Sequence, residues 1–421
     1  MTTSTTPTQT HAPIEITGGL DIGNGYVKGA LRGPDGTTNK FDLPASVALV
    51  TSAADLPTPD SEAVAALDGH IYNELDVSFS SPLIRSPYRH LFGSRGLSAQ
   101  ASRVEEFDVI RDISKAEQEL SKVLVIGLFA AQGLREYVKI HGELPEDQIH
   151  VQARVGLALP IDEYRDFRVQ YAAELKHGHH LVSVHNFETP VSVKVTFVDV
   201  QVAAEGSSAQ FAIRQGGEKL VQAMLDDLAR RGYPLDGLTA HDVHEARNTV
   251  GIDIGEGTVN FPVYSEGKFN GDVSRTFKEG YGTVLLNSMA DLRRAGVAFK
   301  SRKKLAEYLL TEPSAMKAAE HAKVSGIVAA QAELWCQQLA EEFGKVFDDV
   351  RYDAEVAYVY GGGSGPLREI LHPMLLERVG ESFPVLYLDS SYSRHLNREG
   401  LLIAATLVQN QQQSAGKRAK K

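Results

Sequence analysis

Two heptapeptides in this chain share the pattern D-I-G-x-G-x-V: Asp21-Ile22-Gly23-Asn24-Gly25-Tyr26-Val27 and Asp253-Ile254-Gly255-Glu256-Gly257-Thr258-Val259. Each follows an apolar stretch and precedes an alternating one, which predicts a strand, a tight turn and a second strand. Glycines at such a turn let backbone N–H groups approach phosphate oxygens closely. One copy alone could equally be a plain tight hairpin. Two copies in similar surroundings favour a pair of phosphate-binding loops.

The aspartate that opens each heptapeptide indicates a metal site. Asp21 and Asp253 stand where the first strand of each hairpin ends, beside the predicted phosphate loops. A carboxylate does not contact phosphate favourably by itself. It can hold Mg²⁺, usually through water, because magnesium keeps much of its hydration shell. We therefore expect both aspartates to be magnesium-binding residues.

The elements around the hairpins predict an internal repeat. Each heptapeptide lies in a three-stranded meander followed by helices and further strands, and the second copy starts near Val250. We therefore expect two α/β domains with a cleft between them. The stretch from Leu56 to Phe107 is expected to be irregular. The expected divisions are a disordered start (1–13), a first domain (14–247) with a smaller inserted subdomain (about 44–110), a second domain (248–390), a helix returning to the first domain (391–408) and a disordered basic tail (409–421).

A third glycine-rich element follows the predicted strand Glu355–Tyr360. It reads Gly361-Gly362-Gly363-Ser364-Gly365-Pro366 and leads into a predicted helix. A strand–glycine–helix junction brings bare backbone and a helix N-terminus to a ligand. It lacks the G-K-[ST] ending of a P-loop and the spacing of a dinucleotide fingerprint. A plain tight turn between strand and helix remains the alternative.

Composition limits the possible partners and the compartment. The net charge of -11 argues against direct binding of nucleic acid. The single cysteine excludes a disulfide framework and a thiolate metal cluster. The start of the chain does not resemble a signal peptide, and the longest apolar stretch, Val123–Ala131, is shorter than the ~20 residues that span a bilayer. We expect a cytoplasmic protein with no membrane contact.

The three glycine elements resemble the phosphate-one, phosphate-two and adenosine motifs of the actin, sugar-kinase and heat-shock-chaperone superfamily. Within it, the chain most resembles the bacterial ParM/StbA plasmid-segregation family, over nearly all of Ile14 to Val408. Further stretches that resemble segments of that family are Gly156–Tyr164 (its LP-x-x-E-Y stretch), Thr196–Val202 with Glu205, Ser274–Met289 and Asn397–Ala405. The resemblance implies an actin-like (ribonuclease-H-like) fold, with a nucleotide bound in the cleft between two α/β domains.

The same resemblance implies roles for individual residues. Glu205, with Asp21 and Asp253, is the expected catalytic set, and Glu205 would orient a water for attack on the γ-phosphate. An acid that only interacts with the dipole of the following helix is the alternative for Glu205. The residues expected to bind the nucleotide are Gly23, Asn24, Gly25, Tyr26, Lys28, Gly255, Glu256, Gly257, Thr258, Gly280, Gly282, Lys304, Gly361, Gly362, Gly363 and Ser364.

Some of these positions depart from the pattern. Asn24 and Tyr26 stand in the first loop instead of Ser or Thr, which puts hydroxyl contacts to phosphate in doubt. Glu256 places an acid in the second loop, where actin also has one. Lys28 could instead be a solvated strand lysine, and for Lys304 a solvated helix face is the favoured interpretation.

The function that the resemblance implies is an ATP hydrolase that forms filaments by self-association. Its cofactors would be ATP (or GTP) and Mg²⁺, and it would segregate or position plasmid or other DNA through a DNA-binding adaptor protein. A small-molecule (sugar or acid) kinase of the same superfold is the alternative, because the fold alone does not determine function.

Overall fold

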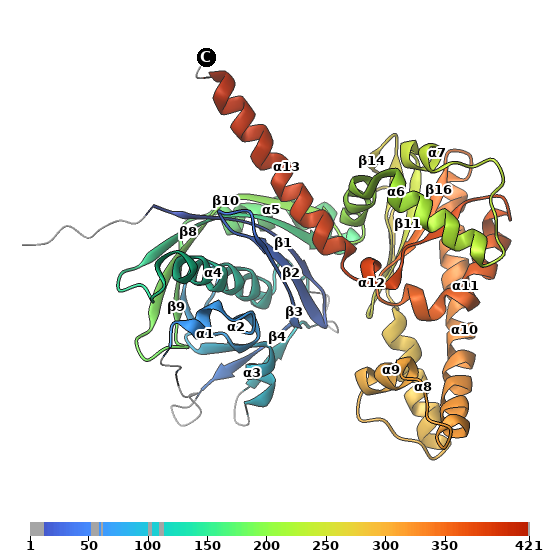
Figure 1. Cartoon of the computed structure of the whole chain (residues 1–421), viewed down its shortest axis with the longest axis horizontal. Coiled ribbons are helices and arrows are strands. Elements are labelled where there is room, and N and C mark those ends of the chain that lie inside the picture. Colours follow the sequence, from blue (N-terminus) through green and yellow to red (C-terminus); the bar gives the residue numbers. More distant parts are fainter. Residues whose placement is uncertain (1–11, 52–58, 60–61, 100–102, 109–112, 420–421) are drawn as a thin grey trace, which may run out of the picture. The chain divides into compact units, whose positions relative to one another are not determined.

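The structure is a computed structural model that describes residues 12–51, 59, 62–99, 103–108 and 113–419. The chain divides into two compact units (Figure 1). Unit 1 comprises Met1–Leu159, Glu163–Ala203 and Arg398–Lys421, and unit 2 comprises Pro160–Asp162 and Ala204–Asn397. Most of the predicted disordered start, 1–13, lies outside the described residues. No helix in the described part is both long and apolar enough to cross a bilayer.

Unit 1 is built on a sheet whose ten described strands follow the order β3-β2-β1-β8-β10-β9-β5-β6-β4-β7. The first three strands form the predicted antiparallel meander, and β8 runs parallel to β1. The strands are β1 (Ile14–Ile22), β2 (Tyr26–Arg32), β3 (Thr38–Pro44), β4 (Ser46–Val50), β5 (Asp76–Ser80), β6 (Arg89–Phe92), β7 (Arg103–Glu106), β8 (Ile149–Leu159), β9 (His180–Val184) and β10 (Val191–Ala204).

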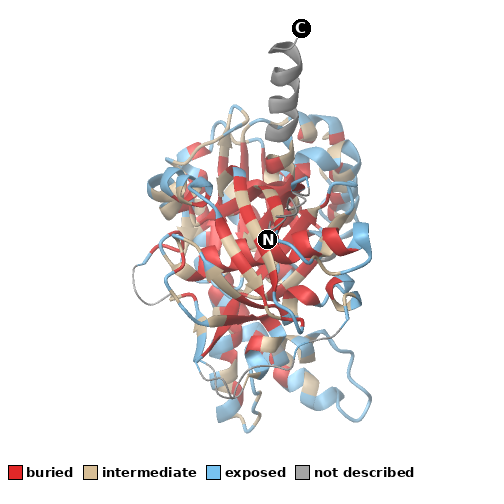
Figure 2. Ribbon diagram, turned by 90° about the vertical axis from the view of Figure 1, so that its left-hand side faces the viewer, coloured by how far each residue is buried: buried red, intermediate tan, exposed pale blue. Residues whose placement is uncertain are grey.

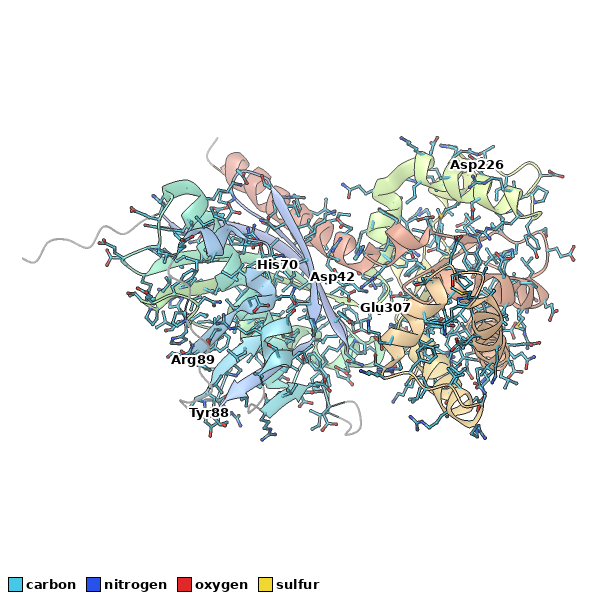
Figure 3. The ribbon with its side chains drawn as sticks, turned by 60° about the horizontal axis from the view of Figure 1, so that its bottom comes forward. Asp42, His70, Tyr88, Arg89, Asp226 and Glu307 are labelled. Carbon is cyan, nitrogen blue, oxygen red and sulfur yellow. The ribbon has the colours of Figure 1, made fainter. Side chains whose placement is uncertain are left out.

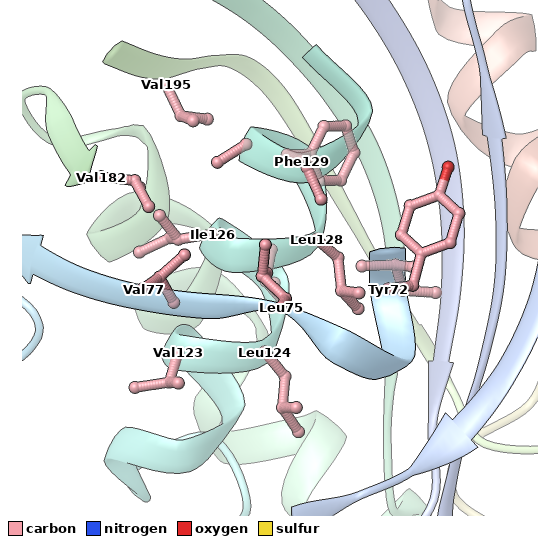
Figure 4. Close-up of a cluster of buried hydrophobic side chains, with 14 of the residues drawn as sticks. Tyr72, Leu75, Val77, Val123, Leu124, Ile126, Leu128, Phe129, Val182 and Val195 are labelled. Atoms are coloured by element: carbon pink, nitrogen blue, oxygen red, sulfur yellow. The ribbon is translucent and has the colours of Figure 1, made fainter. Parts of the chain in front are cut away.

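One apolar helix forms the centre of unit 1. α4 (Glu119–His141) is buried along most of its length and packs against β1, β8 and β9. Its side chains Ile126 and Phe129 meet Val77, Val182 and others in the cluster of Figure 4. The other helices of this unit are α1 (Val64–Leu67), α2 (Ile71–Glu74), α3 (Gly93–Ser98), α5 (Ile161–Lys176) and most of α13 (Leu396–Ala419).

The sequence predicts an irregular stretch from Leu56 to Phe107, and this prediction is wrong for the residues that the structure describes. This region supplies α1, α2 and α3, together with β5, β6 and β7, which join the sheet of unit 1. These strands are four or five residues long, and β5 pairs with the distant β9. Strand formation depends on such partners more than on local preference, so the segment shows no clear periodicity.

Unit 2 is organised around β11 (Thr249–Ile254), which pairs antiparallel with β12 and β13 and parallel with β16. Both β11 and β16 are buried at every residue. Figure 2 colours the described residues by burial, with buried segments in red and exposed ones in pale blue. Pro262 separates β12 from β13 because proline lacks the N–H that a continuous strand would use. The remaining strands are β12 (Val259–Phe261), β13 (Val263–Ser265), β14 (Lys268–Phe269), β15 (Arg275–Phe277), β16 (Val356–Tyr360) and β17 (Val385–Tyr387).

The long helix α10 supplies much of the core of unit 2, packing against α8 and α11. Its buried residues include Trp335, Cys336 and Phe343, so Cys336 is a packed apolar side chain. The helices of unit 2 are α6 (Ser208–Arg230), α7 (Ala240–Glu245), α8 (Tyr281–Arg294), α9 (Arg302–Leu310), α10 (Ala318–Val350), α11 (Ser364–Val379) and α12 (Ser390–Ser393).

The observed division differs from the expected boundaries. Unit 2 includes Pro160–Asp162, and its long segment runs from Ala204, well before residue 247, to Asn397, beyond residue 390. It begins early because α6 packs against α7 and β17. At the other end, α13 continues to Ala419 and includes most of the tail expected to be disordered. Glutamine is a good helix former, and neither Pro nor Gly occurs between Gln409 and Gly416.

Candidate functional site

The two heptapeptides form hairpin turns with the same closure. Gly23 N–H donates to Tyr26 C=O at 2.9 Å, and Gly255 N–H donates to Thr258 C=O at 2.9 Å. The cross-strand register also matches, since Asp21 lies opposite Lys28 and Asp253 lies opposite Asn260. The predicted hairpins are therefore confirmed as structures.

The start of α8 packs on the second hairpin. Tyr281 N–H donates to Gly255 C=O at 3.0 Å, and Gly282 N–H donates to Glu256 C=O at 2.8 Å. Gly280 is the residue just before this helix. Gly280 and Gly282 thus lie at the second loop, as the sequence predicts, and these hydrogen bonds fix the carbonyl side of that loop.

The third glycine element packs on the same strand end. Gly363 N–H donates to Ile254 C=O at 2.9 Å, and Ser364 Oγ donates to Gly361 C=O at 2.8 Å. Gly361 has φ +91°, and a Cβ there would lie 2.6 Å from Asp253 Oδ1, so only glycine fits. Gly362 is exposed, with open space where a side chain would be. The structure brings this loop directly against Asp253.

The turn that carries Glu205 also lies at Asp253. Gly206 has φ +78°, and a Cβ there would lie 3.3 Å from Cβ of both Asp253 and Asn260. Two tyrosines hold the turn: Tyr360 Oη donates to Gly206 C=O at 2.8 Å, and Tyr264 Oη donates to Ser207 C=O at 2.9 Å. Unit 2 therefore places the half-buried Glu205 next to a glycine whose missing side chain leaves room beside Asp253.

Asp253 itself is 7% exposed and accepts a hydrogen bond at Oδ2 from Asn397 Nδ2 at 2.7 Å. The sequence marks Asn397 only as the start of a connecting helix. Its role as a partner of Asp253 was missed because nothing in the local pattern joins these two distant positions.

Comparison with solved structures identifies the fold. No family model matches the sequence, and no curated protein matches it either. The actin-like protein Alp7A is 15% identical over 97% of this chain and 100% of its own, with a TM-score of 0.68. ParM of Bacillus thuringiensis with ADP is 17% identical over 94% and 99%, with a TM-score of 0.58. Ta0583, an archaeal actin homologue, is 14% identical over 93% and 99%, with a TM-score of 0.59.

The chain has an actin-like, ParM-type fold. The fold class that the sequence predicts, two α/β domains of the actin type, is therefore confirmed. At these identities the likeness concerns the fold alone, and the roles of single residues in this ParM-type chain rest on their own surroundings.

Two cations on α9, Lys304 and Arg302, differ in whether their side chains contact the second loop. Lys304, expected near the nucleotide, is exposed, and its Nζ lies 2.7 Å from Oε2 of Glu307, a residue labelled in Figure 3. Arg302, at the start of the same helix, places Nη2 3.1 Å from Glu256 Oε1. Helical geometry explains the difference, since residues two apart on a helix do not face the same way.

The first loop of the ParM-type chain has two lysines beside it. Lys28 Nζ lies 3.8 Å from Asp21 Oδ2, so the predicted lysine and carboxylate do lie together. Lys115, which the sequence analysis missed, is buried and its Nζ donates to Ile22 C=O at 2.9 Å. Asn24 and Gly25 at the loop tip are exposed.

The LP-x-x-E-Y stretch positions the second of these lysines. Glu163, its acid, accepts hydrogen bonds at Oε2 from Ser114 Oγ and from Lys115 N–H, the latter at 2.7 Å. A carboxylate that receives two bonds from adjacent residues fixes their backbone. The motif thus anchors the segment that brings Lys115 to the first loop.

The surroundings of Asp253 fit a magnesium ion held through water. A carboxylate is the hard oxygen donor that Mg²⁺ prefers, and Gly361 keeps free of a side chain the space in which a Cβ would lie 2.6 Å from Asp253 Oδ1. Among the described residues, no group of three or more His, Cys, Asp or Glu could hold a metal ion directly. The donor set therefore suits an ion whose other ligands are water and phosphate.

Proposed function

We propose that this chain is an ATP hydrolase that binds a magnesium nucleotide and polymerises into filaments in a nucleotide-dependent manner. One observation carries the proposal: two glycine-rich loops and the turn of Glu205 all lie at Asp253, whose side chain is buried. The ParM-type fold supports it, since solved ParM structures of this fold contain ADP, AMPPNP or ATP.

In the proposed mechanism, each residue of the cluster has a separate task. Backbone N–H groups of the hairpin loops donate to phosphate oxygens, and Lys28 adds a positive charge at the first loop. Asp253, and Asp21 in unit 1, are the residues that would hold a magnesium ion, each through water. The ion, when bound, neutralises negative charge on the phosphates. Glu205 orients a water for in-line attack on the γ-phosphate.

The proposed purpose is movement or positioning of plasmid or other DNA in the cytoplasm. ATP would favour assembly and ADP would loosen it, so hydrolysis acts as a timer. Subunits that meet head-to-tail through a heterologous contact form an open helix. An adaptor protein would bind the DNA, because the net charge of -11 disfavours direct contact.

Sedimentation tests this proposal. The purified protein should pellet with magnesium and ATP and remain in the supernatant with ADP, and it should release phosphate from ATP without any acceptor substrate. Phosphate transfer to a sugar or an acid, with no pelleting under any nucleotide, would instead establish the small-molecule kinase.

The tyrosine that holds the Glu205 turn gives a sharper test of the mechanism. Tyr360→Phe leaves the buried Gly206 carbonyl without its donor, a loss of about 1 kcal/mol, and frees the turn to shift. We expect phosphate release to slow several-fold while nucleotide affinity stays the same. Tyr358→Phe is the matched control, because Tyr358 lies on the same strand but its hydroxyl donates to Val243 C=O at 3.4 Å. Equal effects of the two substitutions on turnover would contradict the role of the turn.

A further inference from the structure

The amide of Asn397 joins two parts of the proposed site. Its Nδ2 donates to Asp253 Oδ2 at 2.7 Å. On its other side, Ser208 Oγ donates to Asn397 Oδ1 at 3.2 Å and lies 3.4 Å from Asn397 C=O. The orientation of the amide is determined by its partners, because an ionised carboxylate only accepts and needs the NH₂ group.

Ser208 belongs to the segment that carries the proposed catalytic acid. It is fully buried, begins α6 and lies three residues after Glu205. Asn397 therefore connects the carboxylate proposed to hold the metal to the turn proposed to hold the attacking water. Both bonds lie within unit 2, so they depend on no contact with unit 1.

Ser208 and Asn397 also lie near the two ends of one segment of unit 2. The long segment of unit 2 begins at Ala204 and ends at Asn397. Ser208 lies close to its beginning, and Asn397 is its last residue. The hydrogen bonds between them join the two ends of this segment at Asp253.

The residue after Asn397 is held just as firmly, but in unit 1. Arg398 is 5% exposed, and its Nη1 donates to Oδ1 of Asp42, labelled in Figure 3, at 3.4 Å. Its carbonyl oxygen would lie 2.6 Å from a Cβ at Gly19, so the backbone of α13 packs directly on β1.

We propose that Asn397 is a positioning residue, which orients the Asp253 carboxylate for magnesium-bound water and, through Ser208, joins it to the turn that carries Glu205. This inference rests on the proposed function, because it assigns Asn397 a role toward the same magnesium nucleotide. It predicts that Asn397 affects how nucleotide binding depends on magnesium, whereas a residue that only stabilises the fold does not.

The test is nucleotide affinity measured with a fluorescent ATP analogue over a range of magnesium concentrations, and again in EDTA. For Asn397→Ala, we expect the magnesium concentration at half-maximal affinity to rise about tenfold, as fits the loss of one hydrogen bond to a charged group. Affinity in EDTA should remain that of the wild type. Ser208→Ala, which removes the bond on the other side of the amide, should shift the magnesium dependence in the same direction by less.

Asn186→Ala is the matched control. Asn186 is also a buried amide with two hydrogen bonds, to Glu74 C=O and from Asp76 N–H, but it lies in unit 1 away from the hairpin loops. It should lower thermal stability without moving the magnesium dependence. Wild-type magnesium dependence in both Asn397→Ala and Ser208→Ala would overturn the inference while leaving the proposed function intact. A wild-type protein whose nucleotide affinity does not depend on magnesium would overturn both this inference and the proposed function.

Discussion

Glu205→Ala is expected to bind ATP with near wild-type affinity and to hydrolyse it ~10²–10⁴ times more slowly, the usual loss for a positioned acid or base. The reason is that Glu205 is proposed to orient water and to make no contact with phosphate, so its removal acts on the chemical step. If assembly follows ATP binding and disassembly follows hydrolysis, filaments of this variant should form and then persist. Phosphate release and light scattering, followed in the same sample, measure both effects.

The control for this variant is Glu218→Ala. Glu218 lies on the helix that follows Glu205, but it is exposed and pairs with His241, with 2.9 Å between Oε1 and Nδ1. Its removal should leave both phosphate release and filament lifetime unchanged. Near-normal phosphate release in Glu205→Ala would rule out the catalytic role and favour the alternative, an acid that only stabilises the start of α6.

The Asp253→Ala variant is expected to be impaired in nucleotide binding, the step before the hydrolysis that Glu205→Ala slows. A carboxylate that holds a metal through water is an outer partner of that metal, and losing such a partner typically lowers metal affinity 10–100-fold. We therefore expect magnesium–ATP affinity to fall by a similar factor, and assembly to fail at ATP concentrations that saturate the wild type. Calorimetric titration with ATP, with and without magnesium, measures the loss.

A second substitution separates this effect from damage to the fold. Asp253→Ala leaves Asn397 Nδ2 without its acceptor, which by itself costs stability. Asp253→Asn keeps the shape of the side chain and removes only the charge, so it should reproduce the loss of magnesium-dependent affinity with a smaller loss of stability. Unchanged affinity and magnesium dependence in both variants would show that Asp253 is not part of the site.

The sequence predicts the local features of this chain well. Both D-I-G-x-G-x-V hairpins and the glycine loop after β16 are determined by residues within a few positions of one another, because turn chemistry is local. The repeat of the hairpin then suffices to predict the two-domain α/β architecture. By contrast, the short strands β5, β6 and β7 exist because distant strands pair with them, and no local pattern announces such pairing.

The same distinction applies to the site. Asn397 and Lys115 reach the predicted loops across long stretches of sequence, so they could be found only from the folded chain. The contact of Arg302 with Glu256 was missed for a smaller reason, since predicting which residues of α9 reach the second loop requires the exact phase of the helix. The boundary at Ala204 depends on the packing of α6 against β17, which the strand that precedes Glu205 does not reveal.

Electron microscopy of the purified protein with magnesium and a non-hydrolysable ATP analogue tests the central proposal most directly. An actin-like ATPase that assembles in its ATP-bound state should form long filaments under these conditions and none with ADP. The analogue cannot be hydrolysed and keeps the protein in the ATP-like state, whereas ADP keeps it in the state that disfavours assembly. Filaments that form equally well without nucleotide, or the absence of filaments under every nucleotide, would contradict the proposal.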